Sequence, residues 1–321
     1  MRPARAAAAS AILAGMIAVC PSVVHAQSPP QSWPQRGVKI VTPLPAGTGV
    51  DLTARLYADG FAKRWGQPVV VENRVGADGI AAAASFVAAR DDHTLLLSIG
   101  APFTTAPLTV DTLPYDPVAD FTPVCLTAEQ FLAVGAAVST GIATLAALEA
   151  RAKAEPGKLI WAATTGLPQL AFTSFVKRAG LDMAHLVYRD AATPLTDLGE
   201  SRLHVYASGM ASLRPQIDSG KARFLALLGR NRYAGSPDTP TVGEAGYPHM
   251  TVIGLTALFG WKGMPTTLRD RLAGEDKAIA ADPALQARLA TAGLTPRFET
   301  AETVAVLLAE QRATVAGILG K

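Results

Sequence analysis

Short apolar runs alternate with segments of helical periodicity along almost the whole chain, and this alternation is the strongest constraint on its fold. Val69-Val70-Val71 and Leu95-Leu96-Leu97 are apolar without polar alternates, which is typical of strands covered on both faces of a parallel sheet. Between the first two expected strands, apolar residues recur at helical spacing and predict one buried stripe. The stripe consists of Ala54, Tyr57, Ala58, Phe61, Ala62 and Trp65. We therefore expect an α/β fold with helices on both sheet faces.

Further elements follow the same alternation. Helical stripes are expected around Leu268/Leu272/Ile279 and Val304/Leu307/Leu308/Val315. Strands are expected at Val38–Thr42, Pro68–Glu72, Thr94–Ile99, Phe131–Val138, Lys158–Ala163, His185–Arg189, Leu203–Ala207, Arg223–Leu228 and Val252–Gly260.

Two irregular stretches suggest how the chain is divided. Thr104–Pro123 is rich in Pro and Asp and Asn231–Pro248 in Pro and Gly, and both predict ordered connecting loops. Together with the strand order and a length that favours two domains, they suggest a middle domain inserted into an outer one. The expected limits are residues 36–138 and 251–321 for domain 1 and residues 139–250 for domain 2, with a hinge at the two crossings.

The N-terminus has the features of a secretory signal peptide. Arg2 and Arg5 precede an apolar run from Ala6 to Val19, and Val24-His25-Ala26 suits cleavage. We expect residues 1–26 to be removed and the mature chain to be soluble in the periplasm. Cys20 raises the alternative of a lipoprotein, although Val19 is bulkier than a lipobox normally accepts.

Charge and cysteine content exclude some classes of function. The net charge of +3 falls to about +1 without the two signal-peptide arginines, and no basic stripe is present, so a nucleic-acid partner is not expected. Cys125 lies in an apolar context and is expected to be a buried small residue rather than a nucleophile.

The stretch from Ile40 to Tyr57 predicts an anion site. A strand ends in the Pro/Gly-rich turn "PLPAGTGVD" and a helix follows directly, which leaves backbone N–H groups without partners at the helix start. Thr48 could cap this helix with Asp51 three residues later, or Asp51 could contact the ligand. A nicotinamide-binding fold is a further alternative, because Glu72 lies where such folds place a ribose-binding acid. Leu52 replaces its third glycine.

The sequence lacks the motifs of hydrolases and of metal sites. The sequence contains no G-x-S-x-G, no H-E-x-x-H and no paired Cys or His at metal-ligand spacing. We expect no catalytic residue, no metal and no cofactor.

Five stretches resemble a known family, the periplasmic solute receptors of tripartite tricarboxylate transporters, also called Bug-type receptors. "PLPAGTGVD" matches the family loop "P-F-P-A-G-G-x-x-D", and "VVVENRVGADG" at Val69–Gly79 matches "VVVENRPGAGG". "LPYDPVADFTPV", "KAEPGKLIWA" and "PDTPTVGEAGYP" match in the same order.

The resemblance implies a two-domain periplasmic binding protein of type II, each domain a mainly parallel sheet flanked by helices. It implies a small carboxylated ligand, held by the loop Pro43–Asp51, here called the opening loop, and by opposing loops of domain 2, with no enzymatic step. The expected ligand-binding residues are Leu44, Ala46, Gly47, Thr48, Asp51, Ser98, Gly100, Thr164, Thr165, Gly166, Arg189, Ala191, Ala192 and Ser208.

The domain 2 loops depart from the family pattern. A common "Y-K-G" is Tyr188-Arg189-Asp190 here, and an Asp-Asn pair is Ser208-Gly209. Aromatic positions near the last crossing are Leu255 and Thr256. Arg189 could pair with a second ligand carboxylate or face solvent.

The function that this resemblance implies is capture of a small organic acid and its delivery to membrane transporter subunits, by a monomer. A receptor that reports its ligand to a membrane sensor kinase is the alternative with the same fold. A third, less favoured function is that of an NAD-dependent oxidoreductase.

Overall fold

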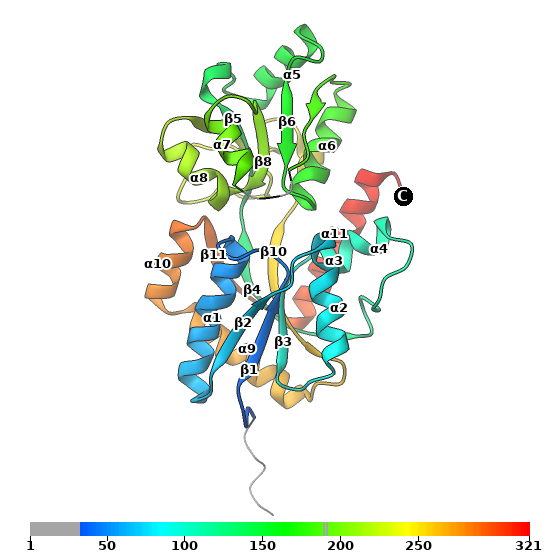
Figure 1. Ribbon diagram of the computed structural model, residues 1–321, viewed down its shortest axis with the longest axis vertical. Coiled ribbons are helices and arrows are strands. Elements are labelled where there is room, and N and C mark those ends of the chain that lie inside the picture. Colours follow the sequence, from blue (N-terminus) through cyan, green and yellow to red (C-terminus); the bar gives the residue numbers. More distant parts are fainter. Residues whose placement is uncertain (1–32, 189, 191) are drawn as a thin grey trace, which may run out of the picture. The chain divides into compact units, whose positions relative to one another are not determined.

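The computed structural model describes residues 33–188, 190 and 192–321, and residues 34–321 form one compact unit. The expectations for the signal peptide, its cleavage after Ala26, Cys20, Arg189 and Ala191 concern residues outside this description. No helix within the described residues is long and apolar enough to cross a membrane. Two sheets, each with helices on both faces, organise the described chain (Figure 1).

Six strands of the described chain form the first sheet, in the order β11-β4-β10-β3-β1-β2. β1 pairs in parallel with β2 and β3, whereas β10 and β11 run antiparallel to their neighbours. The strands are β1 (Val38–Thr42), β2 (Val69–Asn73), β3 (Thr94–Ile99), β4 (Phe121–Gln130), β10 (Gly254–Trp261) and β11 (Leu294–Thr300).

One face of this sheet is covered by α1 (Gly49–Trp65), α9 (Thr266–Ala280) and α10 (Pro283–Thr291). α1 begins where the Thr48 hydroxyl accepts a hydrogen bond from Asp51 N, and it ends at Gly66 with φ 64°, a left-handed conformation that suits glycine. The expected stripe is confirmed at its centre, because Ala54, Tyr57, Ala58 and Phe61 are buried.

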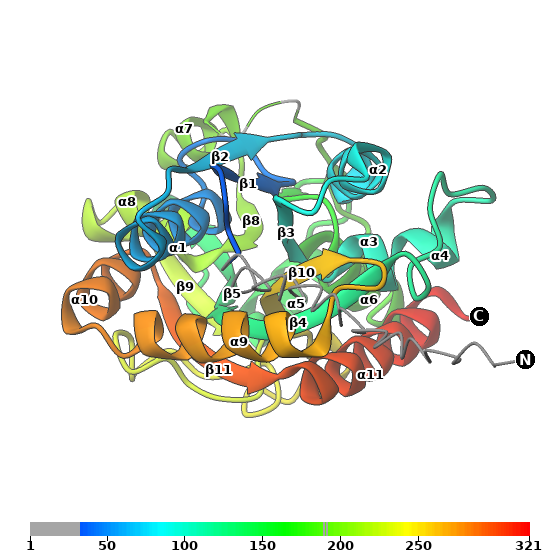
Figure 2. The ribbon, with the colours of Figure 1, turned by 90° about the horizontal axis from the view of Figure 1, so that it is seen from below.

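The other face carries α2 (Ile80–Ala89), the short α3 (Ala101–Thr104) and α4 (Ala106–Thr109), and α11 (Ala301–Leu319). Phe86 of α2, Val304 of α11 and Phe103 share one buried cluster with Leu96. Figure 2 shows α9 and α11 running past β4, on which both pack. Each fully buried side chain of this size contributes about 1.5–3 kcal/mol of hydrophobic free energy.

Five strands of the described chain form the second sheet, in the order β7-β6-β8-β5-β9. α5 (Leu145–Ala154) and α6 (Leu167–Arg178) pack on one face, and α7 (Thr193–Gly199) and α8 (Met210–Asp218) on the other. The strands are β5 (Leu132–Ala137), β6 (Ile160–Ala163), β7 (Ala184–His185), β8 (Val205–Gly209) and β9 (Ala222–Leu227). Short 3-10 turns lie at η1 (Ala77–Gly79), η2 (Val138–Thr140) and η3 (Pro248–Met250).

The expected α/β class with helix-flanked sheets is confirmed, and both sheets are mixed. Parallel pairing holds for β2-β1-β3 and β7-β6-β8, while β4, β5, β9, β10 and β11 pair antiparallel. Two strands were not anticipated, β4 and β11. The chain changes sheet between Gln130 and Leu132, because β5 pairs with β8 and β9. This lies before the expected boundary at residue 138, and the domain limits themselves stay a prediction.

Candidate ligand-binding site

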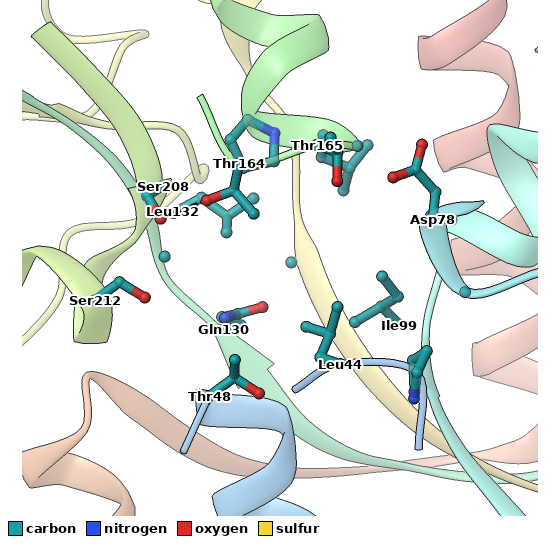
Figure 3. Close-up of a pocket in the computed structure, with 18 of the residues that line it drawn as sticks. Leu44, Thr48, Asp78, Ile99, Gln130, Leu132, Thr164, Thr165, Ser208 and Ser212 are labelled. Atoms are coloured by element: carbon teal, nitrogen blue, oxygen red, sulfur yellow. Dashed lines mark hydrogen bonds between the residues drawn. The ribbon is translucent and has the colours of Figure 1, made fainter. Parts of the chain in front are cut away.

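A pocket of about 280 Å³ lies among strand ends and loops of both sheets (Figure 3). The first sheet contributes the opening loop with the start of α1, the η1 turn, and the chain after β3. The second contributes the β6–α6 loop, the β7–α7 loop and the β8–α8 junction. The polar side chains among the described lining residues are Thr48, Asp78, Gln130, Thr164, Thr165, Tyr188, Asp190, Tyr206, Ser208 and Ser212.

The start of α1 lies at the pocket. Thr48 and Gly49 line the pocket, and Thr48 Oγ1 donates to Pro45 O at 2.8 Å. N–H groups in the first turn of a helix have no partner within the helix, and the helix dipole places partial positive charge there. This end of the pocket therefore suits a carboxylate oxygen.

Asp51 stabilises the opening loop through hydrogen bonds. Its Oδ2 accepts a hydrogen bond from Gly47 N at 3.0 Å and from Arg55 Nε at 3.0 Å. Asp51 does not line the pocket and is 3% exposed. Burial works to raise the pKa of Asp51, but the hydrogen bonds from Arg55, Asn73 and Gly47 outweigh it and leave the pKa below its ordinary value. Of the two roles expected for Asp51, the contacts fit stabilisation of the loop and helix start.

Hydroxyl groups gather on the side of the second sheet. Thr164 Oγ1 lies 2.7 Å from Ser208 Oγ and 3.1 Å from Tyr206 Oη. Thr165 is exposed at the pocket, and Gly166, the N-cap residue of α6, has φ 87°. This group can donate or accept hydrogen bonds with a small polar ligand.

The η1 turn forms a further wall and has an unusual backbone. Ala77 and Asp78 have φ of 45° and 54°, which is uncommon outside glycine. Gly79 has φ 93°, and a Cβ there would lie 2.8 Å from Pro102 Cγ and 3.1 Å from Pro43 Cβ. Glycine is therefore required at this position for the turn to pack against the opening loop. Figure 3 shows the Asp78 carboxylate directed toward the side of the pocket where Thr165 lies.

Gln130 lies where the chain passes from the first sheet to the second. It is the last residue of β4 and pairs with both Gly254 and Leu294. A Cβ on Gly254 would clash with Gln130 O, and a Cβ on Gly209 would lie 2.9 Å from Gln130 Nε2. Because both positions are glycine, the backbone at Gly254 can lie against the backbone of Gln130, and the backbone at Gly209 against its side-chain amide.

The structure brings part of the expected site together. Seven expected residues line the pocket: Leu44, Thr48, Gly100, Thr164, Thr165, Gly166 and Ser208. Five described residues do not: Ala46, Gly47, Asp51, Ser98 and Ala192. Arg189 and Ala191 lie outside the described residues.

The expected residues that do not line the pocket have other contacts. Ser98 is 0% exposed within β3, and its hydroxyl donates to Ile99 O at 3.0 Å. Gly47 has φ 84°, and a Cβ would meet no atom within 4 Å. A side chain at Gly47 would therefore strain the backbone rather than fill space next to a ligand.

Several pocket residues were not anticipated from the sequence. Gln130 and Ser212 belong to a strand end and a helix start that carry no distinctive motif. For Asp78 a signal was present, because "VGADG" has aspartate where the family motif "PGAGG" has glycine.

The described lining contains acids but no lysine, arginine or histidine. Asp190 is already engaged, because its Oδ1 accepts from Thr193 N at 2.7 Å and from Ala192 N at 2.9 Å. Hydrogen bonding to Thr193 lowers the pKa of Asp190. Burial, with donation of its hydroxyl to Asp197, raises the pKa of Tyr188 to about 12.

Glu72, the acid on which the nicotinamide alternative depends, forms ion pairs with two basic side chains. Its carboxylate pairs with Lys39 at 2.7 Å and also with Arg74, and Lys39 is the first cause of its lowered pKa. Glu72 does not line the pocket.

The fold and pocket define an α/β binding protein of the periplasmic type. The chain superposes on a solved periplasmic transporter with a TM-score of 0.82 and 27% identity, covering 90% of this chain and 98% of that one. The periplasmic binding protein BugD gives a TM-score of 0.79 at 26% identity, with coverage of 90% and 98%.

The family follows from the sequence match. Residues 53–321 match the family model described as "Tripartite tricarboxylate transporter family receptor", and the chain belongs to this family. It is 30% identical to a UPF0065 protein of Bordetella bronchiseptica over 305 residues, covering 95% of this chain and 90% of the relative. It is 28% identical to protein BugT of Bordetella pertussis, covering 90% of each.

Two of the similar structures contain carboxylates. A protein of R. palustris solved with adipate has a TM-score of 0.82 at 26% identity, covering 90% of this chain and 98% of that one. MatC of Rhodopseudomonas palustris with bound malate has a TM-score of 0.78 at 25% identity, with coverage of 89% and 99%.

Proposed function

We propose that this protein is an exported receptor that captures a small carboxylated solute and delivers it unchanged to a tripartite tricarboxylate-type membrane transporter. The ligand binds between the opening loop of the first sheet and the hydroxyl-lined loops of the second. A ligand carboxylate accepts hydrogen bonds from the start of α1.

The observation that carries this proposal is the position of Thr48 and Gly49 in the pocket. They bring a helix N-terminus to a cavity of about 280 Å³, close to the lower limit of ligand pockets and suited to a small molecule. The described lining residues contain no cysteine or histidine that could act as nucleophile or base. Binding and release without a chemical step fits this set of groups.

A thermal-shift screen tests the proposal. Mono-, di- and tricarboxylates, amino acids and aromatic acids are added to the mature protein, because a ligand that binds only the folded state raises its stability. We expect at least one carboxylate to raise the melting temperature and to bind in calorimetry. If no carboxylate binds, the proposed function is wrong.

A variant with a bulky side chain in the pocket shows whether the ligand binds there. Thr165 is exposed at the pocket, so Thr165→Trp should abolish binding while the fold is kept. Thr267→Trp places the same side chain on an exposed position of α9 away from the pocket and should bind as the parent does. Uptake of the ligand by cells with and without the gene then tests delivery, because a purely sensory receptor leaves uptake intact.

A further inference from the structure

We propose that Asp78 is a specificity-determining residue that selects ligands carrying a protonated amine in addition to a carboxylate. This inference rests on the proposed function and adds the chemical class of the ligand. The carboxylate would bind at the start of α1 and the ammonium group at Asp78.

The first argument is that Asp78 is held in the pocket wall and lacks a partner. It lines the pocket and is half-buried. Within the part of the chain that the structure describes, its carboxylate makes no hydrogen bond or ion pair. Its φ of 54° and the close packing of Gly79 against Pro102 fix the turn that presents it.

The second argument is the contrast with the other aspartates nearby. Asp51 is satisfied by Gly47, Arg55 and Asn73. Asp190 is satisfied by the backbone at the start of α7. Asp78 is therefore the described carboxylate with unused acceptor capacity toward the pocket.

The third argument is charge complementarity. Asp78 and Asp190 are the charged side chains among the described lining residues, so a second ligand carboxylate placed beside Asp78 would meet a like charge. Like charges brought together in a desolvated site disfavour binding, whereas an ammonium group satisfies the carboxylate. Figure 3 shows Thr48 and Asp78 on opposite sides of the pocket, as a ligand with an anionic and a cationic end requires.

Matched ligand pairs test this inference on the mature protein by calorimetry at neutral pH. The pairs are aspartate with succinate, glutamate with glutarate, γ-aminobutyrate with succinate, and ε-aminohexanoate with adipate. We expect an amine-bearing member to bind at least about tenfold more tightly than its amine-free partner.

Two variants attribute the preference to Asp78. Asp78→Asn keeps the shape and tolerates the left-handed backbone, so it should lower affinity for the amine-bearing ligand about tenfold and reduce or reverse the preference. Asp59→Asn makes the same charge change at an exposed position of α1 outside the pocket and should change neither affinity more than about twofold. Circular dichroism and the melting temperature of each variant establish that it is folded.

The outcomes separate the two proposals. If a carboxylate without an amine binds most tightly, or if Asp78→Asn leaves the preference unchanged, the inference is overturned and the proposed function stands. If no carboxylate binds the parent protein, the proposed function fails and the inference with it.

Discussion

Asn73, at the end of β2, donates a 2.8 Å hydrogen bond from Nδ2 to Oδ1 of Asp51 in the first turn of α1. The same amide group donates to Leu44 O at 2.8 Å. Asn73 and Asp51 thus tie together the two ends of the opening loop, and neither side chain lines the pocket. The loop is shaped before a ligand arrives, which reduces the entropy lost on binding.

Asp51→Ala is therefore expected to weaken both the fold and the site. The substitution removes the acceptor of Gly47 N and one of the two acceptors of the Asn73 amide, which should lower the free energy of unfolding by about 1–3 kcal/mol. Ligand affinity should fall as well, because the loop is no longer held. Urea denaturation and calorimetry measure the two effects, with Asp59→Ala on the exposed side of α1 as the control.

The stability difference between the parent and Asp51→Ala should also depend on pH. The pKa of Asp51 is below its ordinary 3.8 in the folded protein, so its contribution is complete above that value and is lost as the pH falls through the folded pKa. The gap in stability between parent and Asp51→Ala should narrow in acid. A gap that does not change with pH would contradict the assigned hydrogen bonds.

Asp276 should have the opposite pH dependence. It is fully buried beside Cys125 and accepts from Thr127 Oγ1 at 3.0 Å. Burial raises its pKa from 3.8 to about 8, so the folded state binds a proton that the unfolded state has released between those values. Relative to Asp276→Asn, the parent should lose up to about 1.4 kcal/mol of stability per pH unit as the pH rises through this window. Denaturation series at acid, neutral and alkaline pH measure it, and equal slopes would refute the buried neutral acid.

Gly100 and Gln311 should be coupled. Gln311 Nε2 donates to Ile253 O at 2.7 Å, and its Oε1 accepts from Thr104 Oγ1 at 3.1 Å. A Cβ on Gly100 would clash with that Oε1, so Gly100→Ala should displace the amide and cost about 1–3 kcal/mol. In a Gln311→Ala background the same substitution should cost much less. Strictly additive costs in this double-mutant cycle would show that the two positions do not interact.

Ligand binding should make the protein more compact. The chain crosses between the sheets at Phe131 and again between Leu227 and Gly254, and two such crossings can act as a hinge about a bound ligand. Small-angle scattering should give a smaller radius of gyration with a saturating ligand than without it. An unchanged radius with the parent protein would exclude closure, and Thr165→Trp serves as the unliganded control.

Elements with a strong local signal were predictable from the sequence. Val38–Thr42 and Thr94–Ile99 form β1 and β3 with the expected limits, because both runs consist mainly of β-branched and apolar residues. β4 was missed because Pro123 and the polar Glu129 interrupt it, and its strand character comes from antiparallel pairing with β10 and β11. Pairing partners distant in sequence leave no local pattern.

The pocket residues also fall into those that the sequence predicted and those that it did not. Thr48 belongs to the motif "PLPAGTGVD" and lines the pocket. Thr164 and Gly166 line it from the loop after β6, which the family resemblance placed at the ligand although the loop lies outside the five matching stretches. Gln130 and Ser212 enter it only because two strands end at the same place. Gly47 and Asp51 belong to the same motif as Thr48, and Gly47 N donates to Asp51 Oδ2 outside the pocket lining. For Asp51 this contact fits the capping role, one of the two roles that the sequence left open.

The buried thiol of Cys125 can report on this receptor from within its core. Cys125 is 0% exposed in β4, and burial raises its pKa well above the ordinary value, so a thiol reagent can reach it only when the first sheet opens. It is the sole cysteine of a chain that begins after Ala26. Any solute that binds the closed native state should slow labelling in proportion to occupancy. The labelling half-life then ranks unlabelled ligands by affinity without a single change to the pocket.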